Sequence, residues 1–330
     1  MLLRRDYYSM RGTALAIVLA TGAAAQTTLV IQQLDAGQQL RAQGRYNEAR
    51  TLFANLLRDV NSGGGGSSLA AIVLDNAGIN ETYAGDYGAA ETAFNQSLTL
   101  LRASHTDDPI MAALKTHLSE LYIAEQRPRD AEPLLRQAAA SMRSYVHTDA
   151  AALSEIYDNL AVVCTLQRKR EEAETLLRNS AALLEKQVGP DNPRFADPLL
   201  TYAGLLVVEH RYTDALVSAE RAWKILRKSD PPVASSYLAG AASVLASVYF
   251  HLGRNADAES YARTAVELGE KAYGHDHPQV ASYLANYAEI LKRRDRKQAK
   301  EVQERADAIR ARSTSDSPTG YTVAADSLIR

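Results

Sequence analysis

Apolar residues recur at helical spacing along the chain, and the stretch from Leu245 to Pro278 shows the pattern most completely. Leu245 and Tyr249 mark one face of a first predicted helix, and Ala258 and Ala262 mark one face of a second. A glycine between them ends the first helix. Because the connection is short, the two helices are predicted to lie antiparallel, with small residues where they touch.

The same turn pattern, a Gly-Arg-Tyr-like opening followed by an acidic residue and an alanine, recurs along the whole chain. The copies end in Ala49, Ala90, Ala131, Ala173, Ala215, Ala258 and Ala299. The intervals between these alanines are 41, 41, 42, 42, 43 and 41 residues. So regular a period predicts a repeat protein, in which each hairpin buries its apolar face against the next copy.

Several motifs carry a resemblance to a known family. They are GRYNEA at Gly44–Ala49, GDYGAAE at Gly85–Glu91, RDAEPLL at Arg129–Leu135, EEAETLL at Glu171–Leu177 and GRNADAE at Gly253–Glu259. These copies resemble tetratricopeptide repeats. The period of roughly 42 residues, with VGPDNPRFA and GHDHPQVA between hairpins, resembles the kinesin light chain subtype. The resemblance covers about Gln32 to Arg312. It implies an all-α, right-handed superhelical solenoid of about seven antiparallel helical hairpins, but no particular function.

Aligning the copies predicts the domain organisation. The hairpins are expected at about 28–61, 69–104, 108–146, 150–188, 193–228, 232–273 and 278–312. A Gly/Ser linker is expected at 62–68, and a flexible C-terminal tail at 313–330. The turn of the seventh copy is one residue shorter, and its second helix is polar nearly all round, as expected of a terminal cap.

The first 25 residues resemble an export signal. Basic residues precede an apolar run from Ala14 to Ala20, and small residues precede Gln26. We therefore expect cleavage between Ala25 and Gln26 and export to the periplasm or the outside of the cell. The apolar run is too short for a stable membrane span. Export by the general or the twin-arginine route, and a start at Met1 or Met10, remain open alternatives.

Composition gives little support for catalysis or for nucleic-acid binding. The net charge is −2 and the pI is about 6.4, and the basic clusters at Arg168–Arg170 and Lys292–Lys297 fall at solvated turns. Cys164 lies on an apolar stripe and is expected to be buried and inert. The loop His275–His277, with His251 in reach, is interpreted as an ordinary linker of the repeat, with a metal site as the alternative. No cofactor, metal or catalytic group is predicted.

The surface predicted to carry function is the concave wall formed by the first helix of each hairpin. Nine residues before each turn stand Asn76, His117, Asn159, Thr201, Val244 and Asn286. In the family that the chain resembles, an asparagine here bonds an extended peptide, which implicates the three asparagines. Val244 breaks the pattern, and the alternative is that the asparagines only solvate or cap the wall. The predicted peptide-binding residues are Asn76, Ile79, Tyr83, His117, Glu120, Asn159, Val162, Thr201, Phe250 and Asn286.

The predicted function is that of a non-catalytic scaffold or adaptor that binds a protein or peptide in this groove. The alternative is a structural protein of the cell envelope that self-assembles through the solenoid ends. An enzyme with a site in the groove has no residue constellation to support it. Two questions stay open: the oligomeric state, and whether the tail from Ser313 onward reaches the groove.

Overall fold

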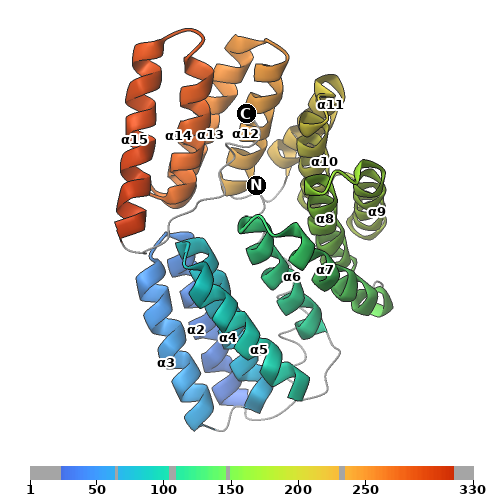
Figure 1. The fold of residues 1–330 in the computed structure, drawn as a ribbon, viewed down its shortest axis with the longest axis vertical. Coiled ribbons are helices and arrows are strands. Elements are labelled where there is room, and N and C mark those ends of the chain that lie inside the picture. Colours follow the sequence, from blue (N-terminus) through green and yellow to red (C-terminus); the bar gives the residue numbers. More distant parts are fainter. Residues whose placement is uncertain (1–23, 64–65, 104–108, 146–148, 230–234, 316–330) are drawn as a thin grey trace. The chain divides into compact units, whose positions relative to one another are not determined.

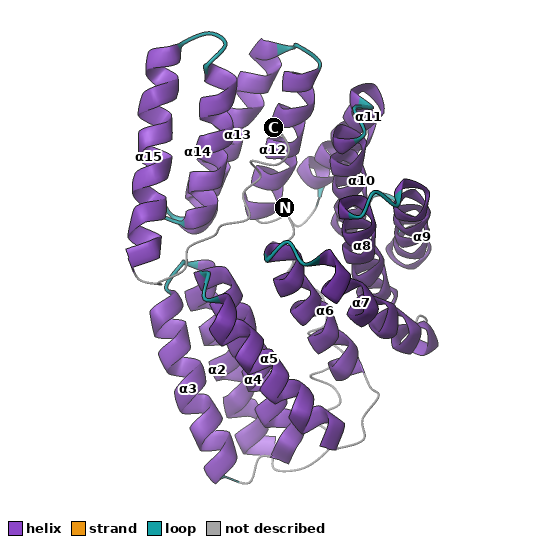
Figure 2. Cartoon of the chain, in the orientation of Figure 1, coloured by secondary structure: helices purple, strands orange, loops and turns teal. Residues whose placement is uncertain are grey.

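The fold was described from a computed structural model that places residues 24–63, 66–103, 109–145, 149–229 and 235–315. Within these ranges, 14 α-helices follow one another in seven successive pairs, and no strand is present (Figure 1). Figure 2 shows the same residues as helices joined by short turns. The predicted all-α class and the seven antiparallel hairpins are therefore confirmed. Residues 1–23 of the predicted export signal and most of the C-terminal tail lie outside the described residues.

The described chain divides between Val163 and Cys164 into two units, here called the N-terminal and the C-terminal unit. The helices of the N-terminal unit are α2 (Ala24–Ala42), α3 (Tyr46–Ser62), α4 (Gly66–Ala84), α5 (Tyr87–Ala103), α6 (Pro109–Ala124), α7 (Pro128–Met142) and most of α8 (Ala150–Leu166). A short 3₁₀ turn, Arg143–Tyr145, follows α7. α4 begins at Gly66, so it includes three residues of the predicted linker. The first amides of a helix need no intrahelical acceptor, so serines are well tolerated there.

The C-terminal unit contains the remaining helices. They are α9 (Arg170–Val188), α10 (Ala196–Val208), α11 (Tyr212–Lys228), α12 (Ser235–His251), α13 (Asn255–Tyr273), α14 (Pro278–Leu291) and α15 (Arg296–Ser315). The 3₁₀ turn Pro193–Phe195 leads into α10. The exposed surface of α15 is rich in charge, including Lys300, Glu301, Glu304 and Arg305. This agrees with the expected polarity of a last helix whose outer face has no further repeat to cover.

Six of the seven hairpins turn in the same way. A residue one or two positions after the end of the first helix has a positive φ, and the amide of the next residue donates to the carbonyl oxygen five residues earlier, as Asp86 does to Glu81. The positive-φ residues are Gly44, Gly85, Gln126, Arg168, His210 and Gly253. The seventh turn instead closes with the amide of Asp295 on the carbonyl of Leu291, four residues earlier. The shorter turn seen in the sequence thus corresponds to a different hydrogen-bond pattern.

Glycine and phenylalanine set the spacing of the helices in the first two hairpins. A Cβ atom on Gly78 of α4 would lie 2.7 Å from the ring of Phe94 in α5, and one on Gly37 would lie 2.4 Å from Phe53. Both rings are fully buried in the cores of their hairpins. The missing side chain therefore makes room for the aromatic ring of the second helix.

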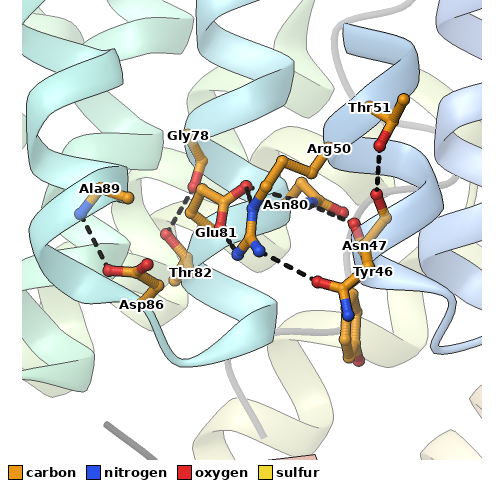
Figure 3. Close-up of polar contacts among 10 residues, drawn as sticks. All are labelled: Tyr46, Asn47, Arg50, Thr51, Gly78, Asn80, Glu81, Thr82, Asp86 and Ala89. Carbon is orange, nitrogen blue, oxygen red and sulfur yellow. Dashed lines mark hydrogen bonds and ion pairs between the residues drawn. The ribbon is translucent and has the colours of Figure 1, made fainter. Parts of the chain in front are cut away.

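Neighbouring hairpins are joined by polar as well as apolar contacts (Figure 3). Arg50 of α3 forms a bidentate ion pair with the buried carboxylate of Glu81 in α4, and its Nε lies 2.9 Å from Oε1. Nδ2 of Asn80 donates to the backbone oxygen of Tyr46 at 3.1 Å. One repeat further on, Tyr122 donates to Glu91 at 2.9 Å across the same 31-residue separation. The same pair of repeat positions thus forms a salt bridge between the first and second hairpins and a hydrogen bond from a neutral tyrosine between the second and third.

The close contact of Gly78 with Phe94 predicts a large effect of a single methyl group. Gly78→Ala should lower the free energy of unfolding by about 2–3 kcal/mol, because the ring must leave its place in a packed core. Gly88→Ala is the matched control, since Gly88 is also helical and its nearest new neighbour would be 4.0 Å away. It should be neutral or stabilising by up to about 1 kcal/mol. Chemical unfolding of both variants measures the difference, and equal effects would contradict the packing assigned to Phe94.

At a turn with positive φ, a substitution that relieves backbone strain is expected to stabilise the protein. Arg168 has φ of +63°, a region that side chains with a Cβ occupy at a cost. Arg168→Gly should therefore raise the free energy of unfolding by roughly 0.5–1 kcal/mol. Gly253→Ala, at the equivalent turn with φ of +74°, should lower it by a similar amount. Thermal unfolding of the pair provides the measurement, and a destabilised Arg168→Gly variant would show that the arginine side chain outweighs the strain.

Candidate functional site

The three predicted asparagines are buried and bond to their own molecule. Their side chains are 7% (Asn76), 0% (Asn159) and 5% (Asn286) exposed. Oδ1 of Asn76 accepts from Gln38 of α2 at 3.1 Å, and its Nδ2 donates to the carbonyl of Ile72 at 3.0 Å. Nδ2 of Asn159 donates to Glu120 at 2.8 Å. These amides link first helices of successive hairpins, so the structure gives them a packing role alongside any contact with a partner.

The links follow the repeat. Gln38 and Glu120 stand at the same repeat position, six residues before their turns, and each bonds the asparagine of the next hairpin. A second type of link joins the position ten residues before one turn to the position nine residues before the next. Asp75 and His117 form it in the N-terminal unit, and Ser243 and Asn286 form it in the C-terminal unit at 3.4 Å. The repeat position of the three predicted asparagines is thus where the first helices of successive hairpins are joined by side-chain hydrogen bonds.

The half-buried predicted residues of the N-terminal unit lie on three successive first helices. Ile79, Glu120 and Val162 occupy one repeat position on α4, α6 and α8, and all three retain partial exposure. Tyr83, also partly exposed, lies under the guanidinium of Arg41, with 5.6 Å between guanidinium carbon and ring centroid. These side chains alternate between apolar and acidic character at regular intervals, which suits an extended segment.

The predicted residues of the C-terminal unit differ in character. Thr201 donates to the carbonyl of Asp197 within its own helix at 3.0 Å, and Val244 is buried. The ring of Phe250 is covered by Arg293, whose guanidinium carbon lies 3.8 Å from its centroid. At the position of Ile79 and Glu120, this unit has the small buried residues Gly204 and Ser247, and Glu289, which is partly exposed. Most of the predicted residues that keep some exposure therefore lie in the N-terminal unit.

His117 is the most strongly perturbed titratable group at these positions. Its Nδ1 lies 2.9 Å from both carboxylate oxygens of Asp75, and the two side chains are 18% and 14% exposed. Burial lowers the pKa of His117. The charge and hydrogen bond of Asp75, together with the charges of Glu120 and Glu155, outweigh the effect of burial and raise the pKa of His117 to about 10. The imidazole is therefore a cation at neutral pH, held among acidic groups. Glu155 lies outside the predicted set, because no local pattern in the sequence points to it.

The other candidate groups serve the fold. Nδ1 of His277 accepts from the amide of Gln279 at the start of α14, and its ring stacks on Tyr273. His251 stacks on Tyr212 with centroids 4.7 Å apart. Cys164 is a buried free thiol. Among the described residues, no three His, Cys, Asp or Glu side chains gather closely enough to hold a metal ion.

Comparisons of sequence and structure give a consistent result. A profile described as the tetratricopeptide repeat matches residues 30–103 and 237–311, and a second profile of the same description matches residues 153–194. Together these matches span more than half of the chain. No curated protein sequence matches the chain.

Several solved structures have a similar fold at low identity. One is a Rap protein complexed with competence and sporulation factor, at TM-score 0.61 and 15% identity, covering 88% of this chain and 78% of that one. BtubC (BKLC) from P. vanneervenii matches at 0.50 and 18% identity, over 72% and 90%. A kinesin light chain with TPR-like repeats from Podosopora anserina matches at 0.48 and 19% identity, over 63% and 99%. The first two similarities support the fold alone.

The pKa of His117 predicts a pH-dependent contribution to stability. Its folded pKa is raised above the ordinary 6.5, so the contribution is complete below pH 6.5 and is lost as the pH rises towards 10. His117→Gln should cost roughly 2–4 kcal/mol at pH 6 and clearly less at pH 9.5. Urea unfolding at the two pH values measures this. His275→Gln, at a residue 77% exposed, is the control and should change little. A cost independent of pH would mean that His117 is not charged in the folded protein.

Proposed function

The chain belongs to the tetratricopeptide repeat family, and from that premise we propose that it is a protein-interaction scaffold that binds an extended segment of a partner along the first helices of its hairpins. Proteins built from these repeats generally mediate protein–protein interaction and are generally non-catalytic. In this proposal the chain catalyses nothing, and its specificity comes from side chains carried on a helical framework.

One observation carries the proposal. In the N-terminal unit, Ile79, Glu120 and Val162 remain partly exposed at one repeat position of α4, α6 and α8. Their alternation of apolar and acidic character matches what an extended chain with alternating side chains needs. The buried asparagines next to them hold the helices in register, which keeps the binding positions fixed before a partner arrives.

Export to the periplasm or the cell exterior remains part of the proposal, and it rests on the sequence of residues 1–25 alone. In the part of the chain that the structure describes, no helix combines the length and the apolar character needed to cross a membrane. Self-assembly through the repeat ends is the second candidate function that the sequence raised. The charged exposed surface of α15 does not favour it, because stacking would bury those charges.

The test compares variants on two faces of the hairpins. The chain from Gln26 onward is captured from its native envelope, the partner is identified, and its affinity for purified variants is measured by calorimetry. Tyr83→Ala with Val162→Ala removes two partly exposed side chains of first helices and should raise the Kd about tenfold or more. Val217→Ala, 67% exposed on the second helix α11, is the control and should leave the Kd unchanged.

A partner that is affected by Val217→Ala and not by the first-helix variant would bind the opposite face, and the proposed binding surface would be wrong. Capture of the chain with only copies of itself would favour the self-assembly alternative. Circular dichroism of each variant establishes that it is folded before its affinity is compared.

A further inference from the structure

Four large apolar side chains are exposed among the described residues, and two of the four occupy the same place in the repeat. The four are Leu29, Leu166, Val208 and Val217. Leu166 ends α8 and Val208 ends α10, both lie in the C-terminal unit, and they are 43% and 49% exposed. The first helices of the N-terminal unit end instead in Ala42, Ala84 and Ala124. A single exposed apolar residue needs no explanation, whereas one that recurs at the same repeat position indicates a surface.

Contacts between successive hairpins place the turns of the C-terminal unit side by side along one edge. These contacts are Arg170 with Glu209 at 3.9 Å, Tyr212 stacked on His251 with centroids 4.7 Å apart, and Arg293 with Asn255 at 3.2 Å. Figure 2 shows two of the turns, α12–α13 and α14–α15, at the same end of the unit. Residues 166–170, 208–212, 251–255 and 292–297 therefore follow one another, and they are here called the turn edge.

The middle of the turn edge is apolar and aromatic. Leu166 and Val208 are followed along the edge by the stacked rings of Tyr212 and His251, and both rings are partly exposed. The charged groups of the turn after Val208 pair with one another, since Arg211 forms an ion pair with Asp214 at 2.9 Å. Side chains that combine an apolar body with a polar tip, such as tyrosine, suit a boundary between water and an apolar phase.

Cations are concentrated at the two ends of the turn edge. Exposed cations of the first turn are Arg168, Lys169 and Arg170, and those of the last turn are Lys292, Arg293, Arg294, Arg296 and Lys297. Glu289 pairs with Lys292 and Glu259 pairs with Arg294. Within the described ranges, the side chains of Arg168, Arg296 and Lys297 form no hydrogen bond or ion pair. The turn edge thus keeps cations at both ends that the fold itself does not neutralise.

The first turn of α15 differs in charge from those of the second helices before it. In the C-terminal unit, α9, α11 and α13 carry acidic residues there, Glu171 and Glu172, Asp214, and Asp257. These residues complement the positive end of the helix dipole. α15 has no acidic residue in its first turn and begins with Arg296 and Lys297. Two cations at this end cost local stability, so they do not serve the helix, and an external anion would offset the cost.

From these observations we propose that the turn edge docks on an anionic phospholipid surface. Leu166 and Val208 enter the headgroup region, and the cations at the two ends lie against lipid phosphates. Apolar side chains beside basic clusters are the combination by which proteins bind membrane surfaces. A membrane surface is broad, so it contacts groups from several turns at once, whereas an extended peptide follows the helix faces. The inference goes beyond the proposed function, because it concerns other residues and another kind of partner.

The expected binding is reversible and salt-dependent. A Lys or Arg side chain near an anionic membrane strengthens binding about fivefold. Two partly inserted aliphatic side chains add a smaller contribution that salt does not screen. Binding should therefore be strong only when both contributions act together, and a neutral membrane should bind the chain weakly.

The test measures binding of the purified chain to lipid vesicles by co-sedimentation. One set of vesicles contains phosphatidylglycerol and phosphatidylcholine, and the other contains phosphatidylcholine alone. The chain from Gln26 onward is used, since it is the expected product of signal cleavage and lacks the apolar run Ala14–Ala20, which would itself bind a bilayer. We expect the anionic vesicles to bind it about tenfold or more tightly than the neutral vesicles, and added salt to reduce the difference.

A charge variant locates the basic contacts. Changing Arg168, Arg296 and Lys297 together to glutamine should weaken binding to the anionic vesicles about tenfold or more. The matched control changes three exposed lysines in the last turns of α9, α11 and α13, at the opposite ends of those helices, namely Lys186→Gln, Lys228→Gln and Lys271→Gln. This control removes the same total charge and should weaken binding only about twofold or less.

An apolar variant tests insertion. Leu166→Gln with Val208→Gln should weaken binding to the anionic vesicles about fivefold or more, because two apolar side chains no longer enter the headgroup region. Leu29→Gln with Val217→Gln changes the other two exposed large apolar residues and should leave binding unchanged. All four residues are exposed, so the variants are expected to fold, and circular dichroism checks this.

Three results would overturn the inference. They are equal binding of both kinds of vesicle, equal loss of binding in the edge variants and their controls, and full binding by the apolar variant. If no vesicle is bound and a captured protein partner instead loses affinity for the charge variant, the turn edge takes an acidic protein segment and the lipid proposal is wrong. None of these results decides the proposed function, which is tested by Tyr83→Ala with Val162→Ala.

Discussion

The structure depends on the close approach of two helices within each hairpin. An alanine near the start of every second helix makes it possible, and in six of the seven copies, from Ala49 to Ala258, that alanine has no accessible surface. A larger side chain there would separate the helices and open the apolar layer between them. The tight left-handed turn just before the second helix has the same effect, because it fixes where that helix begins.

A hairpin built this way still exposes an apolar face, and the next hairpin covers it. The contacts between hairpins are therefore where the repeat tolerates variation. Arg50 and Glu81 form an ion pair at one junction, and Glu91 and Tyr122 replace it with a neutral donor at the next. Along the first helices, Gln38, Glu120 and Ser243 each contact an asparagine of the following copy. Polar groups are accepted there because each finds a partner in the neighbouring repeat.

These links connect stability and the proposed binding role. Where the two groups of a link are neutral, as with Gln38 and Asn76, the contact is satisfied within the protein. Charged groups form such links too, since Asp75 contacts the imidazole of His117 in the next hairpin at 2.9 Å. At the repeat position of Ile79 and Glu120, the C-terminal unit has the small buried residues Gly204 and Ser247 and the partly exposed Glu289.

The sequence by itself determined the all-α class, the number of hairpins and the position of each turn, because helical periodicity and turn chemistry are local and repeat about every 42 residues. It also located the position of Asn76, Asn159 and Asn286 on the first helices. Only the tertiary structure decided that these amides are buried and bonded between repeats, and that the charge of Glu155 acts on His117. Such contacts join residues about 40 positions apart, and their distances depend on how one hairpin packs on the next, which no local pattern records.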